Sequence, residues 1–157
     1  MKIGIVAPSP VPFCIGGAEN VYWGLLDRIN QHTSHQAELI KVPTPETGFF
    51  SLMAGYRRFF HLDMRHFDLV ISAKYPAWMV THDRHVCYML HRLRGVYDTY
   101  HFTGCPTDVT TAHAGVRDCL SFMQRTVLQR DAVPELMDRL TALQGDETAP
   151  ADLFAFP

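Results

Sequence analysis

Two adjacent glycines near the start of the chain are the first residues whose spacing suggests chemistry. Gly16 and Gly17 follow an apolar segment at 2–7 through a proline-rich loop, and they open a helical pattern. In an α/β fold such a joint lies at the carboxyl end of a parallel strand, where ligands usually bind. Glycines let the backbone approach a ligand closely, and a helix N-terminus attracts phosphate. The pair therefore indicates a backbone cradle for a diphosphate or for a sugar acceptor, and a flexible strand-to-helix turn is the structural alternative.

The residues around the glycines exclude two common nucleotide motifs. The spacing fits neither the GxGxxG pattern of dinucleotide-binding folds nor the GxxxxGK[ST] pattern of a P-loop. Glu19 lies in the expected first turn of the helix. A carboxylate at that place interacts favourably with the helix dipole. Glu19 is therefore a candidate for a helix-capping role or for a contact to a bound phosphate or sugar.

A histidine, an arginine and an aspartate follow the fourth expected strand, at 85–90. His91 stands directly after that strand, at the same carboxyl edge of the sheet as Gly16. Its imidazole could donate a hydrogen bond or change its charge near neutral pH. Arg94 could neutralise a phosphate or an anionic acceptor, and Asp98 could orient either group. The structural alternative is a polar loop with a local pair between Arg94 and Asp98.

Lys74 follows the third expected strand, at 67–72, and so projects at the same edge. Its structural alternative is a solvated lysine beside aromatic packing. Three loops, carrying Gly16, Lys74 and His91, are thus expected to converge on one edge of the sheet. This convergence indicates a ligand site more strongly than any one motif does alone.

Other clusters favour structural roles. His82 and His85 are close in sequence, but no third ligand completes a metal site, so no metal is expected. The basic and aromatic run at 57–60 could touch a membrane surface, whereas a helix that packs Phe59 inward is the favoured interpretation. The cysteines form no CxxC pair and are interpreted as reduced core thiols of a cytosolic protein: Cys14, Cys87, Cys105 and Cys119.

Length and composition predict one domain of ordinary size with a substantial core. The chain has 157 residues, of which 47% are hydrophobic and 19% charged, and its formal net charge is -2. This balance gives no reason to expect a nucleic-acid partner. No run of about 18 apolar residues is present, so no transmembrane helix is expected. Prolines close to the N-terminus argue against a signal peptide, and a cytoplasmic location is expected.

The elements that must position these side chains alternate between strands and helices over the first ninety residues. The patterns predict strands at 2–7, 36–42, 67–72 and 85–90, helices at 18–30 and 49–60, and a helical turn at 77–80. Such an order predicts a Rossmann-like parallel sheet flanked by helices. Helices are expected again at 116–127 and from Pro134 onward. We therefore divide the chain into an α/β domain at 1–115 and a helical extension with a loose tail at 116–157.

The motifs of the first hundred residues together resemble the N-terminal half of a family 4 glycosyltransferase. The resemblance rests on the start at 2–8, the Gly-Gly-Ala-Glu loop at 16–19 and the strand at 67–72. The segment 87–98, which contains His91, adds to it. The likeness covers about the first hundred residues, and the combination is more specific than any single motif.

The resemblance implies a GT-B architecture, in which two Rossmann-like domains face each other across a cleft. The N-terminal domain mainly holds the acceptor, and the C-terminal domain mainly holds the nucleotide-sugar donor. Transfer in this family retains the anomeric configuration and needs neither a metal nor another cofactor. The implied partners are a nucleotide sugar, a glycan or lipid-linked acceptor and, for this chain, a separate donor-domain polypeptide. Peripheral contact with the inner face of a membrane would suit a lipid-linked acceptor.

The same resemblance implies roles for individual residues. Gly16 and Gly17, with Glu19, would lie close to the donor phosphates and sugar. His91 would contact the transferred sugar and is the catalytic candidate. The acceptor-side candidates are Lys74, Arg94 and Asp98.

The chain also departs from the family pattern. Family members are about twice as long, and their donor domain carries a basic pair and a Glu-x7-Glu motif that nothing after residue 100 supplies. Half a cleft should bind a nucleotide sugar poorly, because donor binding needs groups from both sides. A truncated product, one half of a split enzyme and a degenerate copy all remain open. The alternatives are a non-catalytic module that binds a glycan or a protein, and an unrelated nucleotide-binding domain of the flavodoxin type.

Overall fold

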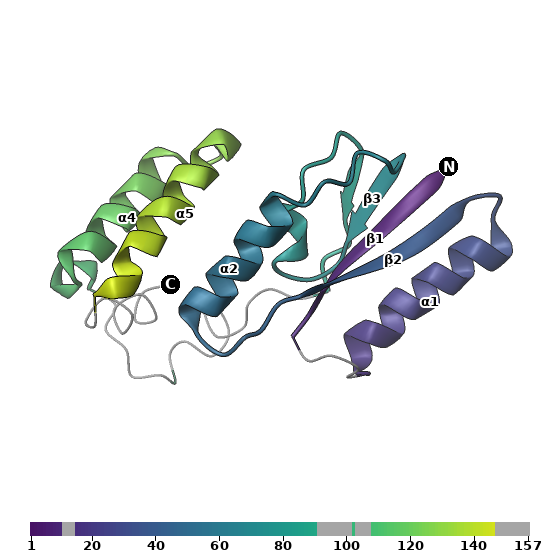
Figure 1. Ribbon diagram of the computed structural model, residues 1–157, viewed down its shortest axis with the longest axis horizontal. Helices are drawn as coiled ribbons and strands as arrows, with labels where there is room; N and C mark the ends of the chain where they lie inside the picture. The colour runs from purple at the N-terminus through teal and green to yellow at the C-terminus, as the bar shows by residue number, and fades with distance from the viewer. Residues whose placement is uncertain (11–14, 91–101, 103–107, 147–157) are drawn as a thin grey trace. The chain divides into compact units, whose positions relative to one another are not determined.

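The computed structural model describes residues 1–10, 15–90, 102 and 108–146 and divides into two compact units (Figure 1). The first unit comprises Met1–Thr47 and Ala54–Arg92, and the second comprises Gly48–Met53 and Leu93–Pro157. The division expected from the sequence at residue 115 stays a prediction.

The first unit is built on a four-stranded sheet in which every strand pair is parallel. The strands are β1 (Lys2–Ser9), β2 (Gln36–Pro43), β3 (Leu69–Ser72) and β4 (His85–Cys87), in the order β2-β1-β3-β4. Helix α1 (Gly17–His32) follows β1, and helix α2 (Phe49–Phe60) follows β2. The predicted Rossmann-like parallel α/β sheet flanked by helices is confirmed, whereas the second domain of a GT-B fold stays a prediction.

The central strand β1 buries both of its faces, as its continuous apolar sequence requires. On one face Ile3 and Ile5 pack with side chains of α1. On the other face Val6 packs with Phe59, from the C-terminal half of α2. The two helices accordingly cover opposite faces of the sheet (Figure 1). Phe59 is fully buried, so its predicted inward packing is confirmed.

The helical spacing of Val21, Leu25, Leu26 and Ile29 predicts the buried stripe of α1, and the structure differs from this prediction at one position. Leu25, Leu26 and Ile29 pack on the sheet as their spacing predicts. Val21, expected on the same stripe, is 37% exposed, and Tyr22 is buried in its place. Tyr22 precedes Leu25, Leu26 and Ile29 at intervals of three, four and seven residues, which is the spacing of one helical face. The aromatic residue therefore fills the place nearest the carboxyl end of the strands.

Strand β4 differs from the buried six-residue strand that the sequence predicts. It ends at Cys87 rather than at Leu90, and it pairs with β3 on one side. Val86 is 48% exposed, and the Cys87 thiol is also exposed. The interpretation of Cys87 as a core thiol is therefore wrong. An apolar run predicts burial only when both faces and both edges of the strand are covered, and the described residues leave β4 partly open.

Besides the N-terminal part of α2, the described residues of the second unit form the helices α4 (Ala114–Arg125) and α5 (Val133–Ala142). Short 3₁₀ turns flank them at η3 (Val109–Thr111), η4 (Arg130–Ala132) and η5 (Leu143–Gly145). Pro134 lies in the first turn of α5, as predicted, where its missing N–H costs nothing. The start and type of both helices therefore agree with the sequence pattern.

The spacing of Val116, Leu120, Met123 and Val127 predicts the apolar face of α4, and only its first half is confirmed, since Leu120 packs against the cluster of Val116. Val116 is buried as expected, together with Cys119 and Phe122. Met123 and Val127, which the sequence pattern places on the same face, are 45% and 65% exposed. The spacing of the buried residues is three rather than four, and α4 ends at Arg125, before Val127 is reached. Cysteine acts here as a small hydrophobic residue.

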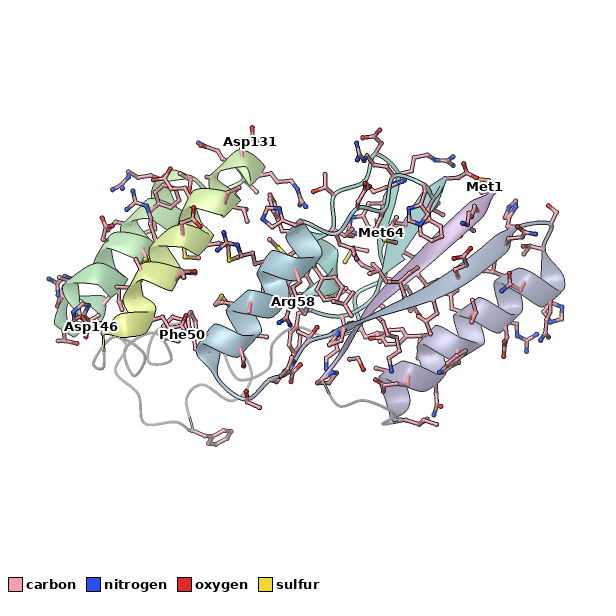
Figure 2. All side chains as sticks on the ribbon, viewed as in Figure 1. Met1, Phe50, Arg58, Met64, Asp131 and Asp146 are labelled. Atoms are coloured by element: carbon pink, nitrogen blue, oxygen red, sulfur yellow. The ribbon has the colours of Figure 1, made fainter. Side chains whose placement is uncertain are left out.

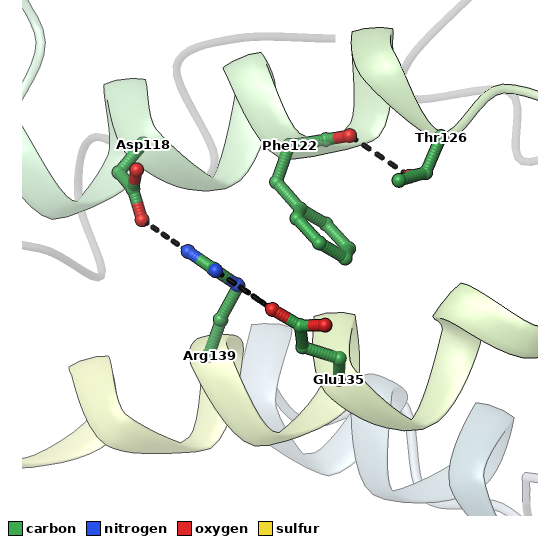
Figure 3. A network of polar contacts seen from close by, with 5 residues as sticks. All are labelled: Asp118, Phe122, Thr126, Glu135 and Arg139. Atoms are coloured by element: carbon green, nitrogen blue, oxygen red, sulfur yellow. Dashed lines mark hydrogen bonds and ion pairs between the residues drawn. The ribbon is translucent and has the colours of Figure 1, made fainter.

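A polar network holds α4 beside α5 (Figure 3). The Arg139 guanidinium donates to Asp118 on α4 at 2.5 Å and to Glu135 on its own helix at 2.7 Å. It also lies 4.5 Å above the ring of Phe122. Arg139 thus joins α5 to α4 through one ion pair and one cation–π contact, because Asp118 and Phe122 both lie on α4.

Candidate functional site

The order of the strands defines a topological switch point between β1 and β3. From β1 the chain moves to β2 on one side and then returns to β3 on the other side. In open parallel sheets ligands bind outside the carboxyl ends of the strands at such a point. The residues that follow β1 and β3 include Gly16, Gly17 and Lys74. The sheet therefore places these sequence candidates where a ligand is expected.

The N-terminus of α1 begins at the glycine pair. Gly16 is the N-cap, and the first bond within the helix runs from the Asn20 N–H to the Gly16 carbonyl at 3.1 Å. The N–H groups of Gly17, Ala18 and Glu19 consequently have no partner within the helix. Among the described residues, a Cβ built on Gly17 meets no atom within 4 Å. The first turn of α1 is thus open where a ligand would approach its backbone.

Glu19 caps the helix on which it stands. Its carboxylate accepts a hydrogen bond from the Gly16 N–H at 3.1 Å. This contact satisfies one backbone donor and puts a negative charge at the positive end of the helix. The structural role considered for Glu19 is therefore present. A bound anion would have to approach beside this carboxylate, so Glu19 lowers the affinity of the helix end for phosphate.

Tyr22 is buried beneath this helix end. It packs with Ala7 from β1 and Ala73 after β3, and Ala18 from the first turn of α1 joins the cluster. The side chain is 1% exposed, and its hydroxyl has no hydrogen-bond partner among the described residues. Burial, together with the nearby charge of Glu19, raises the pKa of Tyr22 to about 12. Sequence reasoning missed this residue, although its helical spacing could have indicated it.

Lys74 lies at the other side of the switch point and is largely buried. Its ammonium forms an ion pair with Glu46 at 3.6 Å, and its side chain is 15% exposed. It also lies 4.9 Å over the ring of Tyr75. The interpretation of Lys74 as a solvated lysine is therefore wrong, whereas its place beside an aromatic ring is confirmed.

Glu46 is a second residue that sequence reasoning missed. It follows β2, and its carboxylate accepts a hydrogen bond from the Tyr75 hydroxyl at 3.4 Å besides pairing with Lys74. Burial and the negative charge of Glu46 raise the pKa of Tyr75 to about 12. The signal in the sequence is weak: Glu46 is one more polar residue at the carboxyl end of a predicted strand. The pair leaves this part of the site close to electrically neutral.

The loop that carries the catalytic candidate lies outside the described residues. This holds for His91, Arg94 and Asp98, whose roles stay predictions. The backbone leading to them is described: the Leu90 N–H donates to the Ala73 carbonyl at 2.9 Å. Leu90 also packs in the Tyr22 cluster. The residue directly before His91 therefore lies beside the residue directly before Lys74, as the predicted convergence of the loops requires.

The histidines near β4 make contacts of other kinds. His82 accepts from the Arg84 N–H through Nδ1 and contacts the Phe67 carbonyl through Nε2, each at 3.0 Å. His85 Nε2 lies 2.8 Å from the hydroxyl of the fully buried Ser72. Within the part of the chain that the structure describes, no three His, Cys, Asp or Glu side chains gather as a metal site. No described helix is both long and apolar enough to cross a membrane.

Comparisons with protein-family models, with curated proteins and with solved structures found no match to this chain. The geometry of the site and the sequence resemblance are therefore the grounds for a functional proposal.

Proposed function

We propose that this chain is the N-terminal, acceptor-side domain of a retaining glycosyltransferase. The reaction moves a sugar from a nucleotide-sugar donor to a glycan or lipid-linked acceptor. The observation that carries the proposal is the open first turn of α1, at Gly16 and Gly17, beside the switch point of a parallel sheet. The resemblance to family 4 glycosyltransferases implies that the phosphates of the donor would bind at this helix end.

The proposal assigns donor binding to one side of the switch point and acceptor binding to the other. The backbone N–H groups of the first turn of α1 supply donors that suit phosphate oxygens. The Tyr22 hydroxyl beneath them has a free hydrogen-bonding capacity within the described structure. Lys74, held by Glu46, lies on the proposed acceptor side. His91 would contact the transferred sugar, with Arg94 and Asp98 on the acceptor side.

A separate donor-domain polypeptide completes the site in this proposal. The Glu19 carboxylate at the helix end and the pairing of Lys74 with Glu46 both reduce the attraction of the first unit for an anion. We therefore expect the chain alone to bind a nucleotide sugar weakly and to transfer nothing. Groups from the second polypeptide would supply the missing positive charge at the diphosphate.

The test compares two glycines of α1 that are equally open. In the described part of the chain, neither Gly17 nor Gly24 has an atom within 4 Å of an added Cβ, so the described residues leave room for an alanine at both places. Calorimetric titration with UDP- and GDP-sugars should show saturable binding by the wild type and by Gly24→Ala. Gly17→Ala should bind at least roughly tenfold more weakly, because its methyl group keeps the phosphates from the backbone. Equal binding by all three proteins would refute the proposal for this helix end.

A second candidate function, a non-catalytic module that binds a glycan, is favoured by the charge balance of the site. Among the described residues, Glu19 is engaged with the helix backbone, and Lys74 and Glu46 are engaged with each other. A neutral saccharide would suit such a site better than a diphosphate does. The discriminating measurement is saccharide binding by His91→Ala, which persists in a binding module and leaves an enzyme without transfer.

A further inference from the structure

The turn that joins α4 to η4 holds a leucine in a backbone conformation that leucine disfavours. The Gln129 N–H donates to the Thr126 carbonyl at 2.9 Å and closes a four-residue turn. Leu128 is the third residue of this turn, and its φ is 65°. A positive φ at this position normally selects glycine or asparagine, because a Cβ crowds the following carbonyl. Glycine or asparagine would occupy this position with less strain than Leu128 does.

Burial of the Leu128 side chain does not compensate for the strain of its backbone. Leu128 is 100% exposed, and its neighbour Val127 is 65% exposed. Within the described residues, packing of the Leu128 side chain therefore does not offset the strain of its backbone. Backbone strain of this kind is often found at functional positions. We call Val127 and Leu128 the apolar apex.

Positive charge flanks the apolar apex on both sides. Arg125 is the last residue of α4, and Arg130 is the first residue of η4, and both are exposed. Asp131, labelled in Figure 2, is the acidic residue next to them. The segment 125–131 therefore combines two arginines and one aspartate with two exposed apolar side chains.

We propose that the apolar apex inserts into an anionic lipid surface, with Arg125 and Arg130 at the level of the headgroup phosphates. Specific protein interfaces bury roughly 800 Å² on each partner, far more than two side chains offer. A lipid surface needs no complementary shape. It buries apolar side chains, and its anionic headgroups attract the arginines beside them. The proposal goes beyond the glycosyltransferase function and does not depend on it.

The test is the partition of the full chain onto vesicles, measured by sedimentation. Vesicles of phosphatidylcholine with an equal part of phosphatidylglycerol should bind the chain, and vesicles of phosphatidylcholine alone should bind it several-fold more weakly. Leu128→Asn keeps a residue that tolerates the positive φ but removes the apolar side chain. We expect it to bind anionic vesicles at least roughly tenfold more weakly. Arg125→Gln should weaken the binding roughly fivefold, and salt should weaken it further.

Val109→Asn is the matched control. Val109 is 37% exposed in η3, which precedes α4 and so lies at the opposite end of that helix from the apex. Its replacement should leave the partition unchanged, and thermal unfolding should show that every variant is folded. A wild-type chain that ignores anionic vesicles would overturn the proposal, as would equal partition of wild type and Leu128→Asn. Neither outcome would bear on sugar binding.

Discussion

At the scale of single residues, the candidate site is made of polar groups whose partners determine what they can do. Glu19 faces the backbone of its own helix, and Glu46 neutralises Lys74. Tyr22 differs from them, because its buried hydroxyl has no partner within the described residues. A buried polar group without a partner costs stability, so its presence needs a reason. Binding of a ligand at the first turn of α1 would supply that reason.

Tyr22→Phe should therefore change the stability of the fold and the affinity for a ligand in opposite directions. Removing a hydroxyl that has no partner should raise the free energy of unfolding by about 1 kcal/mol, as measured by urea denaturation. The same change should weaken the binding of a nucleotide sugar or saccharide. Tyr75→Phe is the control, because it removes a hydroxyl that is bonded to Glu46 and should lower stability instead. A loss of stability in Tyr22→Phe would show that the hydroxyl has a partner in the folded chain.

Glu46→Gln tests the electrical balance around Lys74. Without the carboxylate, the ammonium keeps its charge and loses its partner, so the affinity for a phosphate-bearing ligand should rise severalfold. The pKa of Tyr75 should fall, because the negative charge that helps to raise it is gone. Glu38→Gln is the matched control, because it also removes a carboxylate that pairs with a lysine. Glu38 pairs with Lys2 at 3.1 Å, at the amino end of the sheet. Calorimetric titration that shows equal gains in both variants would exclude a local effect at Lys74.

At the scale of elements, most of the fold could be predicted and most of the contacts in the site could not. The helices and strands follow from apolar periodicity and from proline positions, which are local properties of the chain. The pair of Lys74 with Glu46 joins residues that follow different strands, and only the sheet brings them together. Tyr22 was missed for another reason: the expected helical stripe began one residue too early, at Val21. The exposure of β4 depends on which other segments cover it. The periodicity of its own sequence does not specify those segments.

Close packing of β1 gives a prediction at this scale. A Cβ on Gly4 would lie 2.8 Å from both Met64 Cε and Phe67 Cδ2. Gly4→Ala should therefore lower the free energy of unfolding by ~1–3 kcal/mol through overpacking. Gly24→Ala, in the open middle of α1, should raise it by up to ~1 kcal/mol, since alanine is the better helix former. Urea denaturation of the two variants should give shifts of opposite sign, and a tolerated alanine at Gly4 would contradict the packing.

At the scale of the whole molecule, the chain joins a parallel α/β unit that carries the candidate site to a helical unit that carries the apolar apex. The sequence predicted both kinds of structure, and the coarse fold is confirmed. The roles assigned to His91, Arg94 and Asp98 stay predictions, because these residues lie outside the described part. The function therefore has to be tested on the intact chain, which contains all of these candidates.

Alkaline stability is a property of the intact chain that follows from two buried tyrosines. The pKa values of Tyr22 and Tyr75 are raised from 10 to about 12 in the folded state. Above pH 10 the unfolded chain loses these protons while the folded chain keeps them, so stability is full below pH 10 and falls as the pH rises toward 12. Each tyrosine should contribute a loss of roughly 3 kcal/mol at most across this range. Urea denaturation should show a shallower decline in Tyr22→Phe, and an unchanged pH dependence would contradict the raised pKa.

The most direct test of the central claim is a calorimetric titration of the intact chain with UDP- and GDP-sugars, combined with an assay for released nucleotide. The account predicts weak, saturable binding that Gly17→Ala weakens at least roughly tenfold, and no released nucleotide until a donor-domain polypeptide is added. Tight binding with turnover by the chain alone would contradict the claim that it is one half of a site. Binding that is absent, or that is the same in Gly17→Ala, would remove the first turn of α1 from the function.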